Sequence, residues 1–282
     1  MAISVEPLSK AIGARVTGVD LRGGLDDAVM NKIRAAWLDN FVIVIPGQDL
    51  SGDDQIAFTE WFGPRQVVRT VKVVDEGPQN FMYVANKKID GMDGVLPEGE
   101  MQFHTDQCYY ENPSRATILF AIEIPAEGGN TRFANAYRAY ESLDDSMKVR
   151  LKSLTALNVY DYDANSTVKT KESSADAPRY AHPMVIRHPE TGREVLYINR
   201  LMTDYIVGMD RAESDALLEE LFQVLEDPAH WYEHVWAPGD MVMWDNMCTL
   251  HARTWFDPAQ SRVLRRTSVA GQAPVAAFAT AA

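Results

Sequence analysis

The sequence has little cysteine, no long apolar run and no recognisable leader. Its 282 residues include only two cysteines, Cys108 and Cys248, which are too few for a disulfide framework and favour a reducing compartment. No apolar run approaches the roughly 18 residues that a membrane span requires. Residues 1–6 lack the basic and apolar segments of a signal peptide. We therefore expect a soluble, cytoplasmic protein.

Basic residues are also scarce relative to acidic ones. Lys and Arg total 27, Asp and Glu total 40, and the formal net charge is −13. This balance argues against nucleic acid or an anionic membrane as the main partner, because both attract basic surfaces. The Gly-x-Gly-x-x-Gly pattern is missing too, which disfavours a Rossmann dehydrogenase. A hydrophobic fraction of 46% is ordinary for a globular chain and excludes wholesale disorder.

Short apolar runs with strand character dominate the chain, and helical patterns lie between them. Helices are predicted over 25–40, 51–61 and 138–154, the last interrupted near 143–144, and after an N-capping Asp210. No linker or repeat divides the sequence. The pattern predicts one domain over 1–282, with a frayed Ala-rich tail over 273–282. We expect a β-rich α+β fold with a double-stranded β-helix (jelly roll) core and flanking helices.

Strands are predicted where apolar runs lie between turn signals. These segments are 16–21, 41–46, 67–74, 80–85, 116–124, 131–134, 184–187, 194–199, 231–236, 241–244 and 263–270. The run over 41–46 is continuously apolar, which predicts a strand buried on both faces. The segment 160–180 is polar and without period, and is either a lid or a disordered surface loop.

Six histidines offer few ways to build a metal site. His104 and Asp106 are two residues apart, so on an extended strand their side chains point to the same face. A second histidine would complete the facial triad of non-haem Fe(II) oxygenases. His188 lies in a Pro-Glu-Thr-Gly turn, where we expect a solvated hairpin. The others are structural or surface histidines unless one supplies the third ligand.

Two arginines near the C-terminus are spaced to share a strand face. Arg262 and Arg266 are four residues apart, and Arg265 lies on the opposite face. Apolar residues surround all three, and a buried arginine requires an anion. That anion is either a ligand or one of the 40 acidic side chains of the protein.

Several spaced motifs together resemble the taurine dioxygenase / chlorophenoxyacetate dioxygenase (TauD/TfdA) family over about 3–271. The motifs that carry the resemblance are Phe103-His-Thr-Asp106, Glu111-x-Pro113, Pro125-Ala-Glu-Gly-Gly-Asn-Thr-Arg-Phe133, Pro238-Gly-Asp-Met-Val-Met-Trp-Asp-Asn246, His251, Arg262 and Arg266. Members of this family are Fe(II)- and 2-oxoglutarate-dependent dioxygenases with a jelly-roll core. The resemblance therefore implies that this chain uses Fe(II), 2-oxoglutarate and O2.

The resemblance also implies roles for individual residues. His104, Asp106 and His251 would bind iron. Arg262, helped by Thr131, would bind the far carboxylate of 2-oxoglutarate, and Arg266 would bind the acidic group of the primary substrate. That substrate would be a small anionic sulfonate, aryloxyalkanoate or other carboxylate. Its hydroxylation would give succinate and CO2 as co-products, with C–S or C–O cleavage where the hydroxylated carbon bears a heteroatom.

The sequence departs from the family pattern at one informative position. Val68 stands where the taurine enzyme has its sulfonate-binding histidine, which argues against taurine itself as substrate. Relatives are commonly dimers or tetramers, so the resemblance implies a homo-oligomer. Two alternatives stay open: a metal-dependent, non-oxidative cupin-like enzyme that consumes no 2-oxoglutarate, and a non-catalytic jelly-roll binding protein.

Overall fold

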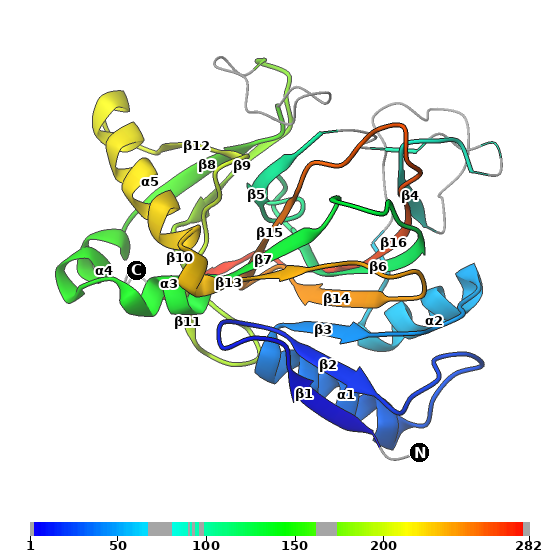
Figure 1. The fold of residues 1–282 in the computed structure, drawn as a ribbon. Helices are drawn as coiled ribbons and strands as arrows, with labels where there is room; N and C mark the ends of the chain where they lie inside the picture. The colour runs from blue at the N-terminus through cyan, green and yellow to red at the C-terminus, as the bar shows by residue number, and fades with distance from the viewer. Residues whose placement is uncertain are drawn as a thin grey trace.

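A computed structural model describes residues 3–66, 81–89, 91, 94–95, 99–161 and 174–278 of the chain. Within these ranges the protein is rich in β-structure, and its helices lie around the sheets (Figure 1). No helix among the described residues is both long enough and apolar enough to cross a membrane. The expected β-rich architecture with flanking helices is confirmed.

Two larger sheets form the centre of the molecule. The seven-stranded sheet has the order β1 (Ser4–Pro7), β2 (Ala14–Thr17), β3 (Val42–Ile45), β14 (Met241–Asp245), β6 (Ser114–Glu123), β16 (Val263–Ala270) and β4 (Met82–Ala85). The four-stranded sheet has the order β13 (Trp231–His234), β7 (Thr131–Asn135), β15 (Thr249–Arg253) and β5 (Met101–His104). All neighbours are antiparallel except β2 and β3.

Smaller elements surround these sheets. Two three-stranded sheets have the orders β11 (Glu194–Leu196), β10 (Val185–Arg187), β17 (Val275–Ala276) and β12 (Thr203–Ile206), β8 (Thr155–Val159), β9 (Arg179–Pro183). The helices are α1 (Asp27–Asn40), α2 (Gly52–Phe62), α3 (Ala136–Ser142), α4 (Asp145–Leu151), α5 (Arg211–Leu225) and the short 3-10 helix η1 (Pro228–His230).

The central strands β3 and β14 of the seven-stranded sheet are buried on both faces. In β3, Val42 and Val44 belong to the large core that also contains Phe133 and Leu250 of the four-stranded sheet. The intervening Ile43 belongs to a second core, formed with α1 and α2. Alternate side chains of one strand therefore enter two cores, which explains the continuously apolar run over 41–46.

Capping side chains begin the helices where the sequence predicts. The Asp26 side chain accepts from the Val29 backbone N–H and begins α1. Ser51 and Asp54 form a reciprocal capping box at α2. Asp210 caps α5, and the predicted interruption near 143–144 separates α3 from α4. These local signals are confirmed because each satisfies backbone donors that a helix start leaves unpaired.

Two predictions about local structure are wrong. The strand that carries His104 ends there, and Asp106 lies in the following turn, where Gln107 adopts a left-handed φ of 60°. The tail after 272 is not frayed throughout, because β17 pairs with β10 and Ala277 is buried. The predicted strand over 67–74 and most of the 160–180 loop lie outside the described residues.

Candidate active site

Two neighbouring strands bring together the residues predicted to bind a metal. His104 and His251 are register partners in β5 and β15, and their ring centroids are 4.0 Å apart. Asp106 in the turn after β5 completes the group. One nitrogen or oxygen atom of each of the three residues lies within 4.8 Å of the others. The structure therefore joins a far C-terminal histidine to the His-x-Asp segment.

The two imidazoles offer unprotonated nitrogen atoms. The Nδ1 atom of His104 lies 2.9 Å from the Gln102 carbonyl oxygen, which can only accept, so Nδ1 carries the proton and Nε2 is left as an electron-pair donor. His251 Nε2 lies 3.9 Å from Asp106 Oδ1, while its buried Nδ1 has no hydrogen-bond partner among the described residues. Burial lowers the pKa of both histidines, which keeps them neutral.

The carboxylate in this group is kept ionised. Burial alone would raise the pKa of Asp106, but the Arg266 guanidinium and the hydrogen bond from Thr117 hold it well below its usual range. Arg266 contacts Asp106 Oδ2 at 2.9 Å. Two neutral imidazoles and one carboxylate are the protonation states that a divalent metal ion requires, so the donor set fits such an ion.

Arg262 is a buried cation without a described counter-ion. It immediately precedes β16, is 3% exposed, and its Nε donates to the Gly129 carbonyl oxygen at 3.1 Å. In the described part of the chain no carboxylate lies within ion-pair distance of its guanidinium. Burial, together with the neighbouring Arg253 cation, lowers the pKa of Arg262. A buried guanidinium in this position is suited to an anionic ligand.

Thr131 lies two residues after Gly129, whose carbonyl oxygen accepts from Arg262, but the Thr131 hydroxyl has another partner. Its hydroxyl accepts a hydrogen bond from the Trp236 indole at 3.0 Å, and the side chain is buried. Two residues earlier, Gly129 receives the Arg262 Nε bond. Thr131 also pairs in register with Arg253. The segment before β7 therefore links Thr131 to the two buried arginines through backbone contacts.

The prediction that Arg265 and Arg266 lie on opposite faces of the strand is confirmed. Arg266 points to Asp106, as described above, whereas Arg265 donates to the side chain of Gln55 and to the backbone oxygens of Leu50 and Ser51. The second arginine thus holds the start of α2 against the far face of the sheet. Only Arg266 faces the histidine–aspartate group.

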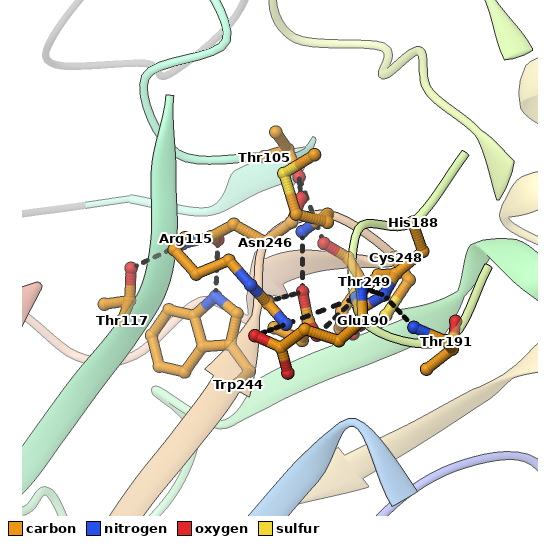
Figure 2. Close-up of polar contacts among 12 residues, drawn as sticks. Thr105, Arg115, Thr117, His188, Glu190, Thr191, Trp244, Asn246, Cys248 and Thr249 are labelled. Atoms are coloured by element: carbon orange, nitrogen blue, oxygen red, sulfur yellow. Dashed lines mark hydrogen bonds and ion pairs between the residues drawn. The ribbon is translucent and has the colours of Figure 1, made fainter. Parts of the chain in front are cut away.

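One histidine prediction is wrong, and it hid a second polar cluster. The expected hairpin is present and its tip is exposed, but the His188 side chain is buried, with the imidazole 2.9 Å from Asp245 Oδ2. Arg115 forms an ion pair with the same carboxylate and another with Glu190 (Figure 2). The His188 side chain points inward because it pairs with Asp245, a long-range contact that turn composition does not reveal.

The remaining histidines lie away from the metal-ligand candidates. His182 contacts the Tyr110 carbonyl oxygen at 3.0 Å, and His234 lies 3.1 Å from Asp240. His230 ends η1 and is partly exposed. These three are structural or surface residues, as predicted. Val68 lies outside the described residues.

Comparison with known proteins identifies relatives along nearly the whole chain. The family model described as "Taurine catabolism dioxygenase TauD, TfdA family" matches residues 4–268. The (S)-phenoxypropionate/alpha-ketoglutarate-dioxygenase of Sphingobium herbicidovorans is 35% identical, covering 96% of each chain. The alpha-ketoglutarate-dependent 2,4-dichlorophenoxyacetate dioxygenase of Cupriavidus pinatubonensis is 30% identical, covering 98% of this chain and 100% of that one. A crystal structure of a taurine dioxygenase from Burkholderia xenovorans matches with a TM-score of 0.79, 32% identity, and 97% and 93% coverage.

Proposed function

The chain belongs to the TauD/TfdA family, and from this premise we propose that it is a 2-oxoglutarate-dependent dioxygenase acting on a small organic anion. One observation carries the proposal: Arg266 of β16 contacts Asp106 of the His104, Asp106 and His251 group, and Arg262, just before the same strand, is a buried cation with no carboxylate partner in the described ranges. A non-oxidative cupin-like enzyme or a binding protein would have no use for that cation.

The three residues His104, Asp106 and His251 would hold the iron. Iron(II), when bound, supplies the activation of O2 and the oxidising power of the reaction. The protein contributes two neutral imidazoles and a charged carboxylate in a largely water-excluded site. His251 is the partly exposed member of the group, which leaves one side of the site accessible to ligands. Three protein ligands leave positions for substrate and O2.

Arg262 would hold the far carboxylate of 2-oxoglutarate. A guanidinium offers two parallel N–H donors that match a carboxylate, and burial strengthens this contact because water does not compete. Thr131 would add a hydroxyl from β7 of the four-stranded sheet. The Gly129 carbonyl fixes the arginine through Nε, which leaves the terminal nitrogens for the ligand.

Arg266 would orient the acidic group of the primary substrate. Its guanidinium already contacts the anionic Asp106, so a substrate bound to it would lie beside the candidate metal ligands. An aryloxyalkanoate is the first substrate class to test, since the two curated relatives described above are named for such acids. Hydroxylation at the carbon next to the ether oxygen would break the C–O bond.

The arrangement of sheets supports a double-stranded β-helix as the scaffold. The seven-stranded and four-stranded sheets share one large core, and the two candidate histidine ligands lie on adjacent strands of the four-stranded sheet. The segment 160–180 would act as a lid, a proposal that concerns mainly residues outside the described ranges. One domain of this kind would accommodate both anion sites.

Succinate release tests the proposed function. Purified protein with Fe(II), ascorbate and 2-oxoglutarate is incubated with aryloxyalkanoates, sulfonates and simple carboxylates, and succinate is measured with and without each candidate. We expect release that depends on one of these acids. An anaerobic Fe(II) protein that shows no visible charge-transfer band on addition of 2-oxoglutarate would contradict the proposal, and metal binding without that band would favour the cupin-like alternative.

A further inference from the structure

A chain of buried hydrogen bonds leads from an indole ring to the candidate metal-binding carboxylate. Trp244 Nε1 donates to Asn246 Oδ1 at 3.0 Å, and Asn246 Nδ2 donates to Thr117 Oγ1 at 2.9 Å (Figure 2). Thr117 Oγ1 in turn donates to Asp106 Oδ2. All four residues are buried. The chain crosses from β14 to β6 and ends at the turn after β5.

The direction of this chain is determined at its far end. An indole N–H can only donate, so it selects the oxygen of the Asn246 amide and turns the Nδ2 group toward Thr117. The Thr117 hydroxyl then accepts from Nδ2, and its single hydrogen is left for Asp106. Every donor in the series points toward the carboxylate, which favours its charged form.

The turn after β14, which contains Asn246, also contacts the segment from His104 to Asp106 at a second point. Thr105 lies between His104 and Asp106, and its hydroxyl contacts the carbonyl oxygens of Asn246 at 3.0 Å and Thr249 at 3.1 Å. The turn after β14 is itself anchored by Asp245, through Arg115 and His188. This turn therefore contacts the His-x-Asp segment at the Thr105 hydroxyl and, through Thr117, at the Asp106 carboxylate.

We propose that Asn246 and Thr117 are positioning residues that orient Asp106 for metal binding, an inference that rests on the proposed function. Thr117 and Arg266 engage Oδ2 of Asp106, and the other oxygen, Oδ1, lies 3.9 Å from His251 Nε2. The hydrogen-bond chain thus divides the carboxylate: one oxygen is held by the protein, and the other is left for the metal ion.

Cobalt(II) affinity of the full-length protein tests this role without requiring turnover. Titration followed by Co(II) absorption compares wild type with Thr117→Val, which keeps the side-chain shape and removes the hydroxyl. We expect affinity to fall by about 10–100-fold, the usual consequence of losing an outer partner of a metal ligand. Thr117→Ser restores the hydroxyl and should restore the affinity.

Thr267→Val provides the matched control. Thr267 is also a buried threonine of the seven-stranded sheet, but its hydroxyl contacts Thr59 Oγ1 at 2.7 Å rather than Asp106. A purely structural role for buried threonine hydroxyls would affect both variants alike. The proposal expects Thr267→Val to lower the melting temperature and to keep wild-type Co(II) affinity.

The outcomes separate this inference from the function on which it rests. Folded Thr117→Val with wild-type Co(II) affinity overturns it. Should that variant fail to fold, Asn246→Asp serves instead: it replaces the amide donor with an acceptor that competes for the Thr117 hydrogen, and unchanged affinity there is equally fatal. If wild type and His104→Ala bind Co(II) equally, the metal site itself is refuted, and both proposals fall.

Discussion

Two buried clusters in this protein contain the same kinds of metal-ligating side chains, and only one of them is open. His104, Asp106 and His251 form one group, and His188, Asp245 and Cys248 form the other; in each, the donor atoms lie within 4.8 Å of one another. An arginine pairs with the carboxylate in each group, Arg266 in the first and Arg115 in the second, but in the second group both His188 and Asp245 have fully buried side chains. In the first, His251 is partly exposed.

The difference lies in how completely the nitrogen atoms of the histidines are paired. His188 Nδ1 accepts from the backbone N–H groups of Glu190 and Thr191, and its Nε2 faces Asp245. His251 has a buried Nδ1 without a described partner and an Nε2 directed at Asp106. Residue type alone therefore does not identify a ligand site. A buried histidine whose nitrogen atoms are both paired stabilises the fold, whereas one with an unpaired nitrogen atom is available to bind a ligand.

The same substitution in each cluster gives the largest expected contrast. His104→Ala should reduce Co(II) affinity by more than the roughly 100-fold that an outer partner contributes, and should abolish succinate release. His188→Ala should instead leave Co(II) affinity largely intact and lower the free energy of unfolding by about 1–3 kcal/mol, because buried polar groups lose partners. Metal titration and urea denaturation of both variants measure the contrast, and equal metal affinities would refute it.

Removing the cation of the closed cluster should cost the most stability. Arg115→Leu leaves the Asp245 carboxylate buried without its main counter-ion, so the free energy of unfolding should fall by about 3–5 kcal/mol. Arg132→Leu is the control, since its ion pair with Glu233 is partly exposed and is worth about 0–1 kcal/mol. Similar urea midpoints for the two variants would contradict the assignment of the Arg115 cluster as a buried structural unit.

Substitution of Arg262 should change ligand affinity rather than stability alone. Arg262→Ala should weaken 2-oxoglutarate binding by about 2–5 kcal/mol, because the ligand carboxylate would be buried without a partner. Arg265→Gln removes a buried guanidinium from the opposite face and should affect stability without changing that affinity. Anaerobic titration of the Fe(II) protein measures both constants. Unaltered 2-oxoglutarate affinity in Arg262→Ala would remove this arginine from the site.

The smallest predicted effect is a pH dependence that arises from the open cluster. Burial lowers the pKa of His104 and His251 in the folded state, so the unfolded chain binds more protons below its pKa of about 6.5. Stability is therefore fully present above that value and is lost as the pH falls below it, by up to about 1.4 kcal/mol per pH unit for each histidine.

Urea denaturation of the metal-free protein between pH 7.5 and 5.5 checks this slope. His182 and His230 add to it in the same direction, because burial lowers the pKa of each. His251→Asn should make the slope shallower, since it removes one group that protonates on unfolding. The same slope in both proteins would contradict the assignment of a neutral, buried His251.

Much of the fold and of the candidate site is predictable from the sequence because the relevant signals are local or repeated. Capping residues such as Ser51 determine where helices begin. The unbroken apolar run over 41–46 predicts β3, a strand buried on both faces. The burial of the His188 side chain is not predictable in this way. Its burial depends on Arg115 and Asp245, which lie 73 and 57 positions away in the chain, and on charges that pair only after the sheets form.

The double burial of β14 has a consequence for folding accuracy. Met241 and Met243 enter one core and Val242 and Trp244 the other, so polarity does not tell the two faces of this strand apart. A slip of one residue would exchange apolar side chains for apolar side chains and meet little resistance along the strand. The first polar side chain after them, Asp245, acts as a stop, because it fits only beside its cationic partner. The turn after β14, which contacts the candidate metal-ligand segment, would thereby also favour the correct register of the sheet.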